Sequence, residues 1–293
     1  MVLRTIGLGD LHEARRLASL SASGRLIEID YPVRPKVRHG WDRPPHPQLL
    51  ALLAAHEDRY RTTLQSFLPL HSALRRITLQ QIEPGQPYWL NGYFPTFDAI
   101  SLYGYIATRR PRRLIEIGSG NSTLFVRRAI TDHRLATRLV SIDPSPRAEV
   151  DAICDEVLRQ PLQDVPLGFF QSVTADDMLF FDGSHRTLQN SDATIFFTEI
   201  VPMLPVGTLV GVHDIFLPFD YPPDWYDRWY SEQYLLACWL LGGDNLRVEL
   251  PVGYLSHTPA PHATLQPLWD DPALAGAGTY GGMFWFSIAS RRV

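Results

Sequence analysis

The stretch Leu114–Thr123 most constrains what this chain can fold into. A short apolar run that contains one acid ends at Ile117, and Gly118-Ser119-Gly120 and a segment with helical spacing of apolar residues follow at once. This order predicts a strand, a tight glycine turn and a helix whose free backbone N–H groups face whatever lies in the turn. Gly118 can adopt a backbone conformation closed to other residues, and Gly120 lets the main chain approach a ligand closely.

A second apolar run, Leu139–Asp143, also ends in a carboxylate. At that place in a doubly wound fold, a carboxylate can accept hydrogen bonds from both hydroxyls of a ribose. Thr123 stands where a dinucleotide fingerprint needs its third glycine, so the turn suits a pyrophosphate poorly. Glu116, just before the turn, suits a cationic part of a ligand. A nucleoside that carries an amino acid therefore fits better than NAD, with Asn121 or Ser122 as the helix cap.

From Leu114 onward the chain alternates between strand-like and helix-like segments. We predict strands at 113–117, 138–143, 156–159, 177–182 and 207–213. We predict helices at 122–131, 147–155, 189–203 and 225–241. Two later strands, 246–252 and 283–289, have no helix pattern between them and predict an antiparallel pair at the sheet edge. The expected fold class is α/β, a Rossmann-like, doubly wound, mostly parallel sheet with a reversed edge strand.

Residues 1–88 predict an N-terminal helical cap and linker, ahead of a ligand-binding domain at 89–293. Apolar residues have helical spacing over Leu11–Leu20 and Gln48–Phe67. Between them, Pro32–Pro47 is rich in proline, arginine and histidine and predicts an extended connector. Its cations either face solvent or neutralise an acidic substrate.

An aromatic run at 87–105 precedes the first strand of the sheet. It predicts one of two arrangements. The run forms a lid over the glycine turn, with Asn91 and Asp98 as its polar contacts, or it joins the N-terminal helices to the sheet.

The composition argues against several classes of protein. The formal net charge is −4, which gives no electrostatic case for a nucleic-acid partner. No apolar run approaches the roughly 20 residues that span a bilayer, and residues 1–16 lack the apolar core of a secretory signal. We therefore expect a cytoplasmic protein with no membrane partner. Cys154 and Cys238 lie in apolar, helix-like segments and are expected to be buried thiols. The sequence leaves the oligomeric state open.

Polar residues follow two of the predicted strands directly. The strand at 177–182 runs into Asp182-Gly183-Ser184-His185, and the next strand ends in His213-Asp214. In an open parallel sheet, ligands bind beyond the carboxyl ends of the strands, so these side chains should converge near the glycine turn. Two carboxylates and two imidazoles can bind a divalent metal or act as a general base with an orienting acid.

Four motifs occur in this order: Ile115–Ser122, Asp143-Pro144, Phe181–His185 and Val212–Asp214. Together they resemble the class I S-adenosylmethionine-dependent methyltransferases. Within that class they are similar to the small-molecule, O-methyltransferase-like branch with Asp-Gly-x-His and His-Asp motifs. The resemblance covers residues from about 87 to 293. It implies transfer of a methyl group from S-adenosylmethionine to a hydroxyl of a small-molecule acceptor, a sugar or a phenolic natural product.

The resemblance also implies how the cofactor is held. Gly118 and Gly120 are expected along its methionine part, and Glu116 is expected to order its amino end. Asp143 is expected to bind the ribose, and the adenine is expected near Pro144 and Gln160–Leu162. The full set of expected cofactor contacts is Glu116, Gly118, Ser119, Gly120, Ser122, Asp143, Pro144, Leu162 and Asp182.

One departure from the resemblance leaves two catalytic mechanisms open. Related metal-dependent O-methyltransferases carry an acid pair at the end of the fifth strand, where this chain has His213-Asp214. In the first mechanism Asp182, His213 and Asp214 hold a divalent metal such as magnesium. In the second, His213 is the general base on the acceptor hydroxyl, and Asp182 or Asp214 positions it. His185 can serve either arrangement.

The loop after His213-Asp214 is expected to contact the acceptor. Prolines at 218, 222 and 223 prevent a helix and stiffen the loop. Its aromatic faces and acids suit a sugar or a phenolic ring. Trp229 and Tyr234 either face the site or anchor the following helix. The predicted substrate contacts are Asn91, Asp98, Tyr221 and Trp225.

Other functions also remain open from the sequence. The main rivals are an NAD-dependent oxidoreductase and a non-catalytic module that binds a cofactor or a partner, with a metallohydrolase as a further alternative. The missing third glycine at Thr123 counts against the oxidoreductase. The polar residues at 182–185 and 213–214 count against a non-catalytic module.

Overall fold

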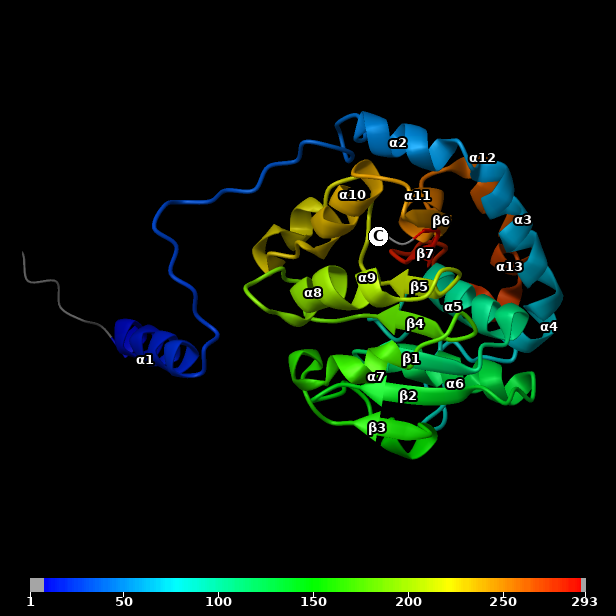
Figure 1. Ribbon diagram of the computed structural model, residues 1–293, viewed down its shortest axis with the longest axis horizontal. Coiled ribbons are helices and arrows are strands. Elements are labelled where there is room, and N and C mark those ends of the chain that lie inside the picture. The colour runs from blue at the N-terminus through cyan, green and yellow to red at the C-terminus, as the bar shows by residue number, and fades with distance from the viewer. Residues whose placement is uncertain (1–7, 291–293) are drawn as a thin grey trace, which may run out of the picture. The chain divides into compact units, whose positions relative to one another are not determined.

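The structure, a computed structural model, describes residues 8–290 and the side chains of residues 11–290. The chain divides into two compact units, 1–36 and 37–293. In the first unit, α1 (Leu8–Ala22) is followed by an extended segment (Figure 1). Helix α1 includes the helix predicted for Leu11–Leu20, and an ion pair between Glu13 and Arg16 joins successive turns of it.

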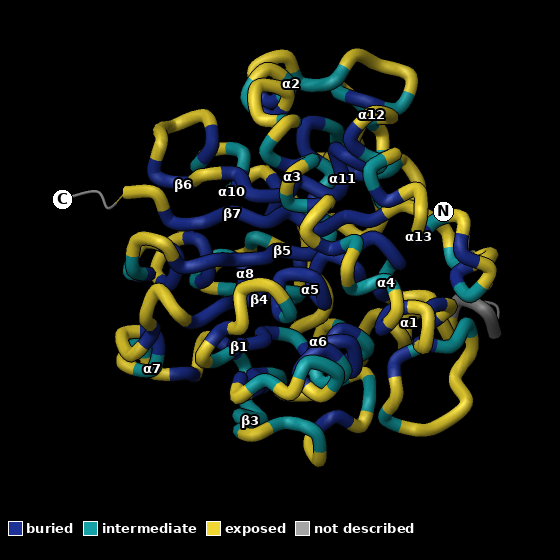
Figure 2. The backbone as a smooth tube through the Cα atoms, turned by 90° about the vertical axis from the view of Figure 1, so that its right-hand side faces the viewer, coloured by how far each residue is buried: buried dark blue, intermediate teal, exposed yellow. Residues whose placement is uncertain are grey.

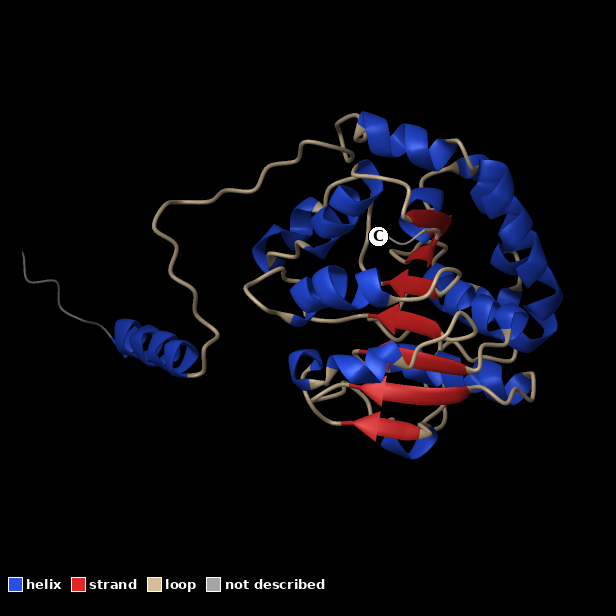
Figure 3. Ribbon diagram, viewed as in Figure 1, coloured by secondary structure: helices blue, strands red, loops and turns tan. Residues whose placement is uncertain are grey.

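The second unit is built on a seven-stranded sheet in the order β3-β2-β1-β4-β5-β7-β6. Strands β1 to β5 pair in parallel, so their carboxyl ends lie at one edge of the sheet (Figure 3). The central strands are buried along their whole length because helices cover the sheet (Figure 2). The strands are β1 (Arg113–Ile117), β2 (Arg138–Ile142), β3 (Glu156–Leu158), β4 (Met178–Phe181), β5 (Leu209–Val212), β6 (Leu246–Pro251) and β7 (Phe284–Ile288).

Strand β7 runs antiparallel to both of its neighbours, as the two late strand patterns predict. It lies between β5 and β6, so the reversed strand is one position in from the edge. Gly211 of β5 makes this packing possible, because a Cβ there would lie 2.5 Å from the ring of Trp285 on β7. The mixed sheet confirms the predicted fold class.

The helices of the second unit surround the sheet. Helix α5 packs beside α6 and against α3. The helix predicted at 189–203 is α8, a π-helical stretch at Phe196–Ile200 and α9 in direct succession. The helices are α2 (Pro47–Ala54), α3 (Glu57–Phe67), α4 (His71–Leu74), α5 (Thr96–Arg109), α6 (Asn121–Asp132), α7 (Leu167–Gln171), α8 (Asp192–Ile195), α9 (Val201–Met203), α10 (Glu232–Leu241), α11 (Val252–Leu255), α12 (Pro259–His262) and α13 (Gln266–Trp269).

The prediction of a helix at 147–155 was wrong. Only a 3₁₀ turn at Asp151–Ile153 forms there. The backbone N–H of Arg147 donates to the carbonyl of Ser119, and the carbonyl of Ile153 accepts from Arg127. These bonds hold the segment against the glycine turn and α6, so its backbone groups are not available for a helical ladder.

Two further predictions need correction. Cys154 is half-buried, and Cys238 is exposed rather than buried because it lies on α10 away from its buried residues Leu236 and Leu240. Helix α10 begins later than predicted, since Pro223–Arg228 forms a 3₁₀ segment before it.

Residues 37–88 belong to the same compact unit as the sheet. The ring of Phe67 on α3 lies 5.4 Å from the ring of Tyr105 on α5, and both side chains are buried. The structure thus divides the chain after Lys36, whereas the sequence places a boundary at residue 88. None of the described helices is long and apolar enough to cross a bilayer.

Candidate functional site

The glycine turn after β1 has the backbone conformation that the sequence predicts. Gly118 has a φ of +82°, in the left-handed region that favours glycine. Its N–H donates to the carbonyl of Ile142, and a Cβ would lie 1.8 Å from the carbonyl oxygen of Asp182. Gly118 therefore locks the ends of β1, β2 and β4 together.

Gly120 contributes differently from Gly118. Its backbone is extended, and a Cβ would meet nothing closer than Arg147 at 3.6 Å. The N–H of Gly120 donates to the hydroxyl of Thr123, which ties the turn to the start of α6. Thr123 is fully buried in the place where a dinucleotide fingerprint has its third glycine.

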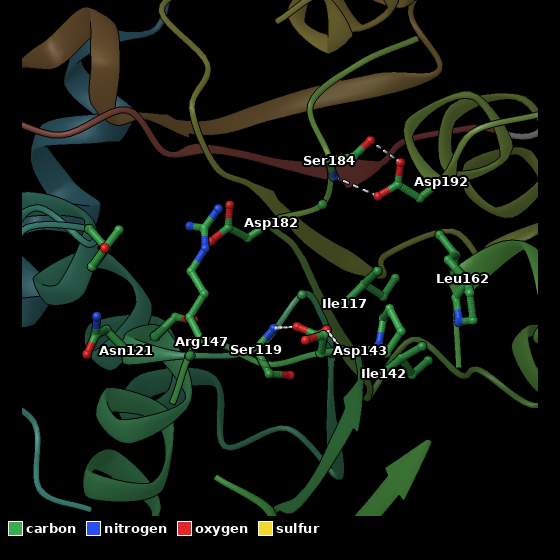
Figure 4. Close-up of a pocket in the computed structure, with 18 of the residues that line it drawn as sticks. Ile117, Ser119, Asn121, Ile142, Asp143, Arg147, Leu162, Asp182, Ser184 and Asp192 are labelled. Carbon is green, nitrogen blue, oxygen red and sulfur yellow. Dashed lines mark hydrogen bonds between the residues drawn. The ribbon is translucent and has the colours of Figure 1, made fainter. Parts of the chain in front are cut away.

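A cavity of about 450 Å³ opens beyond this turn (Figure 4). The turn and the start of α6 form one wall, and Asp143 and Pro144 form another. Leu162 and its neighbours close the third side. The lining residues are Tyr93, Phe94, Ile117, Gly118, Ser119, Gly120, Asn121, Ser122, Ile142, Asp143, Pro144, Ser145, Arg147, Pro161, Leu162, Gln163, Asp182, Gly183, Ser184, Ser191 and Asp192.

Asp143 is oriented by two backbone N–H groups. Its Oδ2 accepts from the N–H of Ser119 at 2.7 Å, and its Oδ1 accepts from the N–H of Ser145 at 2.7 Å (Figure 4). A carboxylate has about four lone-pair sites, so each oxygen can accept a further bond from a ligand hydroxyl. Asp143 is thus a fixed acceptor in the cavity wall.

Glu116 is not among the residues that line this cavity. It is fully buried, and its Oε1 accepts from the hydroxyl of Ser122 at 2.6 Å. Its Oε2 is buried without a hydrogen-bond partner among the described residues. Burial raises the pKa of Glu116 to about 8. The predicted contact of Glu116 with an amino group therefore stays a prediction.

These residues fit S-adenosylmethionine. The cavity is lined by a carboxylate, Asp143, by apolar surface at Pro144 and Leu162, and by the start of α6, where backbone N–H groups are free. Of the nine expected cofactor contacts, all except Glu116 line the cavity.

A second cavity, of about 630 Å³, adjoins the first. Both are lined by Tyr93, Phe94, Arg147 and Asp182. The second cavity also contains His213 and Asp214, and it takes aromatic and basic side chains from 225–230 and a wall from 276–280. Its remaining lining residues are Trp89, Leu90, Gly92, Pro95, Trp225, Arg228, Tyr230, Gly276, Ala277, Gly278 and Tyr280.

His213 lies between two carboxylates. Its Nδ1 is 3.2 Å from Oδ1 of Asp182, and its Nε2 is 3.2 Å from Oδ2 of Asp98. Burial lowers the pKa of His213, but Asp214 and Asp182 outweigh this effect and hold the pKa well above its usual value. Both ring nitrogens therefore face carboxylates, and the raised pKa favours the protonated ring. This geometry argues against the predicted role of His213 as general base.

His185 and two carboxylates form the cluster that the sequence assigned to His213. One ligand atom each from Asp182, His185 and Asp214 lie within 4.8 Å of one another. The Nδ1 of His185 lies 2.5 Å from Oε1 of the fully buried Glu232. Burial lowers the pKa of His185, but Glu232, Asp182 and Asp214 outweigh this effect and hold the pKa well above its usual value. A cation would have to displace a proton from Nε2, which lies 3.3 Å from Oδ1 of Asp182. A carboxylate on Nδ1 is common for metal-bound imidazoles. The donor set of two carboxylates and one imidazole therefore fits a divalent cation.

Two residues of this cluster have a left-handed backbone. His185 has a φ of +63° and Asp214 has a φ of +57°, in a region that residues other than glycine rarely adopt. The carbonyl of His185 accepts from the N–H of Ser231, and the next residue after Asp214 donates to the carbonyl of Gly282. Such strain of roughly 1–3 kcal/mol per residue persists where surrounding bonds fix the conformation, and it is common at functional sites.

Three of the four predicted substrate contacts have internal partners instead. Asn91 accepts from the N–H groups of Tyr93 and Phe94 and shapes a turn. Asp98 is fully buried, where it accepts from the N–H groups of Gly282 and Met283 and contacts His213. Tyr221 is 3% exposed, and its hydroxyl accepts from the N–H of Gln233. None of the three lines either cavity, whereas the fourth, Trp225, lines the second.

Several residues of the site carry no recognisable sequence signal. Glu232 lies a few residues after the proline-containing loop, and only its position at the start of α10 brings its carboxylate against His185. Arg147 and Arg228 lie in segments whose expected helices hid their exposure. Tyr93 is the exception, since it belongs to the aromatic run for which a lid over the turn was one of the two predicted arrangements.

Residues 115–215 match a protein family described as a methyltransferase domain. An uncharacterized protein of Archaeoglobus fulgidus is 33% identical over 92 residues, which make up 29% of this chain and 42% of that protein. The chain thus spans less than half the length of this relative.

Two solved methyltransferase structures are also similar to this chain, at low identity. The O-methyltransferase TomG of Streptomyces achromogenes, in complex with S-adenosylmethionine, is 19% identical with a TM-score of 0.37, over 64% of this chain and 78% of TomG. The methyltransferase PaMTH1 of Podospora anserina is 14% identical with a TM-score of 0.43, over 98% of this chain and all of that one.

The strand order with one reversed strand agrees with the resemblance drawn from the four motifs. The family match covers the glycine turn, Asp143 and the ends of β4 and β5. Residues 115–215 therefore match a methyltransferase domain, and the sheet has a Rossmann-like, mostly parallel topology with one reversed strand.

Proposed function

We propose that this protein transfers a methyl group from S-adenosylmethionine to a hydroxyl of a small molecule. The observation that carries the proposal is the shared wall of the two cavities. Asp182 lies in that wall, with the glycine turn on one side and the cluster of Asp182, His185 and Asp214 on the other. Methyl transfer requires the donor and the acceptor in line at close approach, and adjoining cavities provide that placement.

The first cavity would hold the cofactor. Asp143 would accept hydrogen bonds from the ribose hydroxyls, and Pro144 and Leu162 would flank the adenine. The turn around Gly120 would lie along the methionine part. When bound, S-adenosylmethionine supplies an electrophilic methyl group on a sulfonium, which is also a good leaving group. The protein then has to orient the acceptor hydroxyl and lower the pKa of that hydroxyl.

Asp182, His185 and Asp214 would perform this second task by holding a divalent cation such as magnesium. A cation bound there lowers the pKa of a hydroxyl that contacts it. Glu232 positions the His185 ring through Nδ1. His213 is not one of the ligands; it lies between Asp98 and Asp182 and orients the Asp182 carboxylate. This set differs from the one that the sequence suggested, because His185 takes the place of His213.

The test is an assay for S-adenosylhomocysteine release with a panel of phenols and sugars as acceptors. We expect turnover with at least one hydroxylated acceptor, loss of turnover in a chelator, and recovery with magnesium or manganese. If S-adenosylhomocysteine is released at an unchanged rate in the chelator, the proposed role of the metal is wrong. Protein that binds S-adenosylhomocysteine but methylates only amine or carbon acceptors would contradict the assignment to a hydroxyl.

A further inference from the structure

The second cavity contains two arginines that form no ion pair among the described residues. Arg147 lies with its guanidinium 5.5 Å from the ring centre of Tyr93, and Arg228 lies 3.9 Å from the ring centre of Trp225. Eleven other arginines of the described chain are paired with carboxylates. The guanidinium groups in this cavity therefore have N–H donors that no carboxylate of the described residues occupies.

Stacking on an aromatic face leaves the edge of a guanidinium free. A guanidinium has five N–H donors in a planar fork that matches a carboxylate or a phosphate with two parallel bonds. The ring under Arg228 holds the plane of that fork, so less side-chain freedom is lost on binding. A second ring, Tyr230, lies 5.8 Å from the same guanidinium.

The two arginines differ in what they can contact. Arg147 lines both cavities, whereas Arg228 lines only the second. The charge of Arg147 is therefore shared with a cofactor in the first cavity. Arg228 is the cation that only an acceptor would meet.

The acidic side of the cavity does not cancel these cations. Of its two carboxylates, Asp182 already contacts His213, and both lie near His185. An acceptor with an anionic group would be repelled by the two carboxylates and attracted by the positive charge of Arg228, so it would place that group at Arg228. Trp225 and Tyr230 beside it offer faces for a ring.

We propose that the acceptor is a hydroxylated ring compound with a carboxylate or phosphate group, and that Arg228 binds this group through its free guanidinium edge. This inference rests on the proposed function. It adds that the acceptor is an anion, and it names a residue that determines specificity without taking part in the methyl transfer.

The test compares matched acids and amides on the full-length protein loaded with S-adenosylhomocysteine. Protocatechuate and its amide represent phenolic acceptors, and glucuronate, its amide and phosphorylated glucose represent sugars. Each is titrated calorimetrically. We expect an anion of at least one series to bind roughly 10- to 100-fold more tightly than its neutral partner, as expected for hydrogen bonds to a charged group. Binding in the phenolic or in the sugar series shows which kind of ring the cavity accepts. Comparison of glucuronate with phosphorylated glucose shows whether a carboxylate or a phosphate is preferred.

The matched variants are Arg228→Met and Arg186→Met. Both arginines are exposed and lie near the Tyr230 ring, but Arg186 does not line either cavity. Arg228→Met should abolish the preference for the anion, and Arg186→Met should keep it. Anions that bind no better than their neutral partners, including anions that do not bind at all, overturn the inference, as does a preference that survives in Arg228→Met. Binding of S-adenosylhomocysteine itself reports separately on the proposed function, since that step does not involve Arg228.

Discussion

Glu116 is a buried carboxyl group with no cation beside it among the described residues, and its titration should affect stability. Burial raises its pKa from 4.5 to about 8 in the folded protein. The folded state therefore holds a proton that the unfolded state has released between these two values. Stability from the neutral carboxyl is complete below pH 4.5 and is lost as the pH rises towards 8.

Glu116→Gln removes this titration. At pH 8 the variant should have a free energy of unfolding roughly 2–4 kcal/mol above that of the wild type without cofactor, and the difference should vanish near pH 4.5. Urea denaturation at a series of pH values measures it. The exposed Glu199→Gln should show no such pH-dependent gain. A parallel pair of stability curves for Glu116→Gln and wild type would show that this carboxyl is charged when folded.

The metal cluster makes a prediction about affinity that does not depend on turnover. Manganese should bind to the wild type in an electron paramagnetic resonance titration, and Asp214→Asn should prevent it. Glu232→Gln should weaken binding by roughly 10–100-fold, because the glutamate orients the His185 ring. Asp224→Asn, in the exposed part of the neighbouring loop, serves as the control.

His213→Gln separates the two ligand sets. If His185 is the imidazole ligand, His213→Gln should still bind manganese, whereas His185→Gln should not. The reverse result would restore the set of Asp182, His213 and Asp214 that the sequence suggested.

At these positions the sequence and the structure favour different roles for some of the same residues. It placed Asp182, His185 and Asp214 at one edge of the sheet because parallel strands end there. It could not rank His185 above His213, since the ranking depends on Glu232 and Asp98, which reach the two rings from other elements. Tyr221 and Asp98 had a suitable chemistry for substrate, but the fold uses both of them internally.

Among the elements, the turn between β1 and α6 offers a matched pair of glycines. Gly118→Ala would put a Cβ 1.8 Å from a backbone oxygen and strain a φ of +82°, whereas Gly120→Ala would make only an ordinary contact. Gly118→Ala should therefore lower the free energy of unfolding by about 3 kcal/mol or more. Gly120→Ala should keep the fold and weaken cofactor binding, because Gly120 lines the first cavity and the added methyl group takes up space beside the cofactor.

Thermal melting and calorimetric titration of both variants provide the measurement. Equal stability for the two variants would contradict this account of the turn. So would a stable Gly120→Ala protein with unchanged affinity for S-adenosylhomocysteine.

The strands were easier to predict than the helices for a physical reason. Buried parallel strands are continuous apolar runs, as in Leu179–Phe181 and Leu209–Val212, and such runs are visible in the sequence. The segment at 147–155 carries a helical pattern, but hydrogen bonds from Arg127 and to Ser119 hold it in another conformation. Those partners lie on other elements, so no local pattern reveals them.

For the molecule as a whole, the boundary after Lys36 leads to a prediction about truncation. A protein that starts at Val37 should melt at the temperature of the full chain. A protein that starts at Gly85 loses α2, α3 and α4, which exposes the partner surface of the buried Tyr60, Leu64 and Phe67. Each of these side chains contributes roughly 1.5–3 kcal/mol by burial, so this shorter protein should aggregate.

Size-exclusion chromatography and thermal melting distinguish the outcomes. A monomeric protein from Gly85 with an unchanged melting temperature would show that residues 37–84 do not cap the sheet, and would contradict the helical cap that the sequence predicts. A large loss of stability on removal of residues 1–36 would contradict the division of the chain into two units.

The central claim is that the cavity beyond Gly118 binds S-adenosylmethionine, and calorimetric titration with S-adenosylhomocysteine tests it most directly. We predict saturable binding at one site per chain. Asp143→Ala removes the acceptor for the ribose hydroxyls, whose charge-assisted bonds are each worth about 1.5–3 kcal/mol. Its affinity should fall at least roughly tenfold while the melting temperature of the unliganded protein shows that the fold is kept. No saturable binding to the wild type, or equal affinity in Asp143→Ala, would contradict the account.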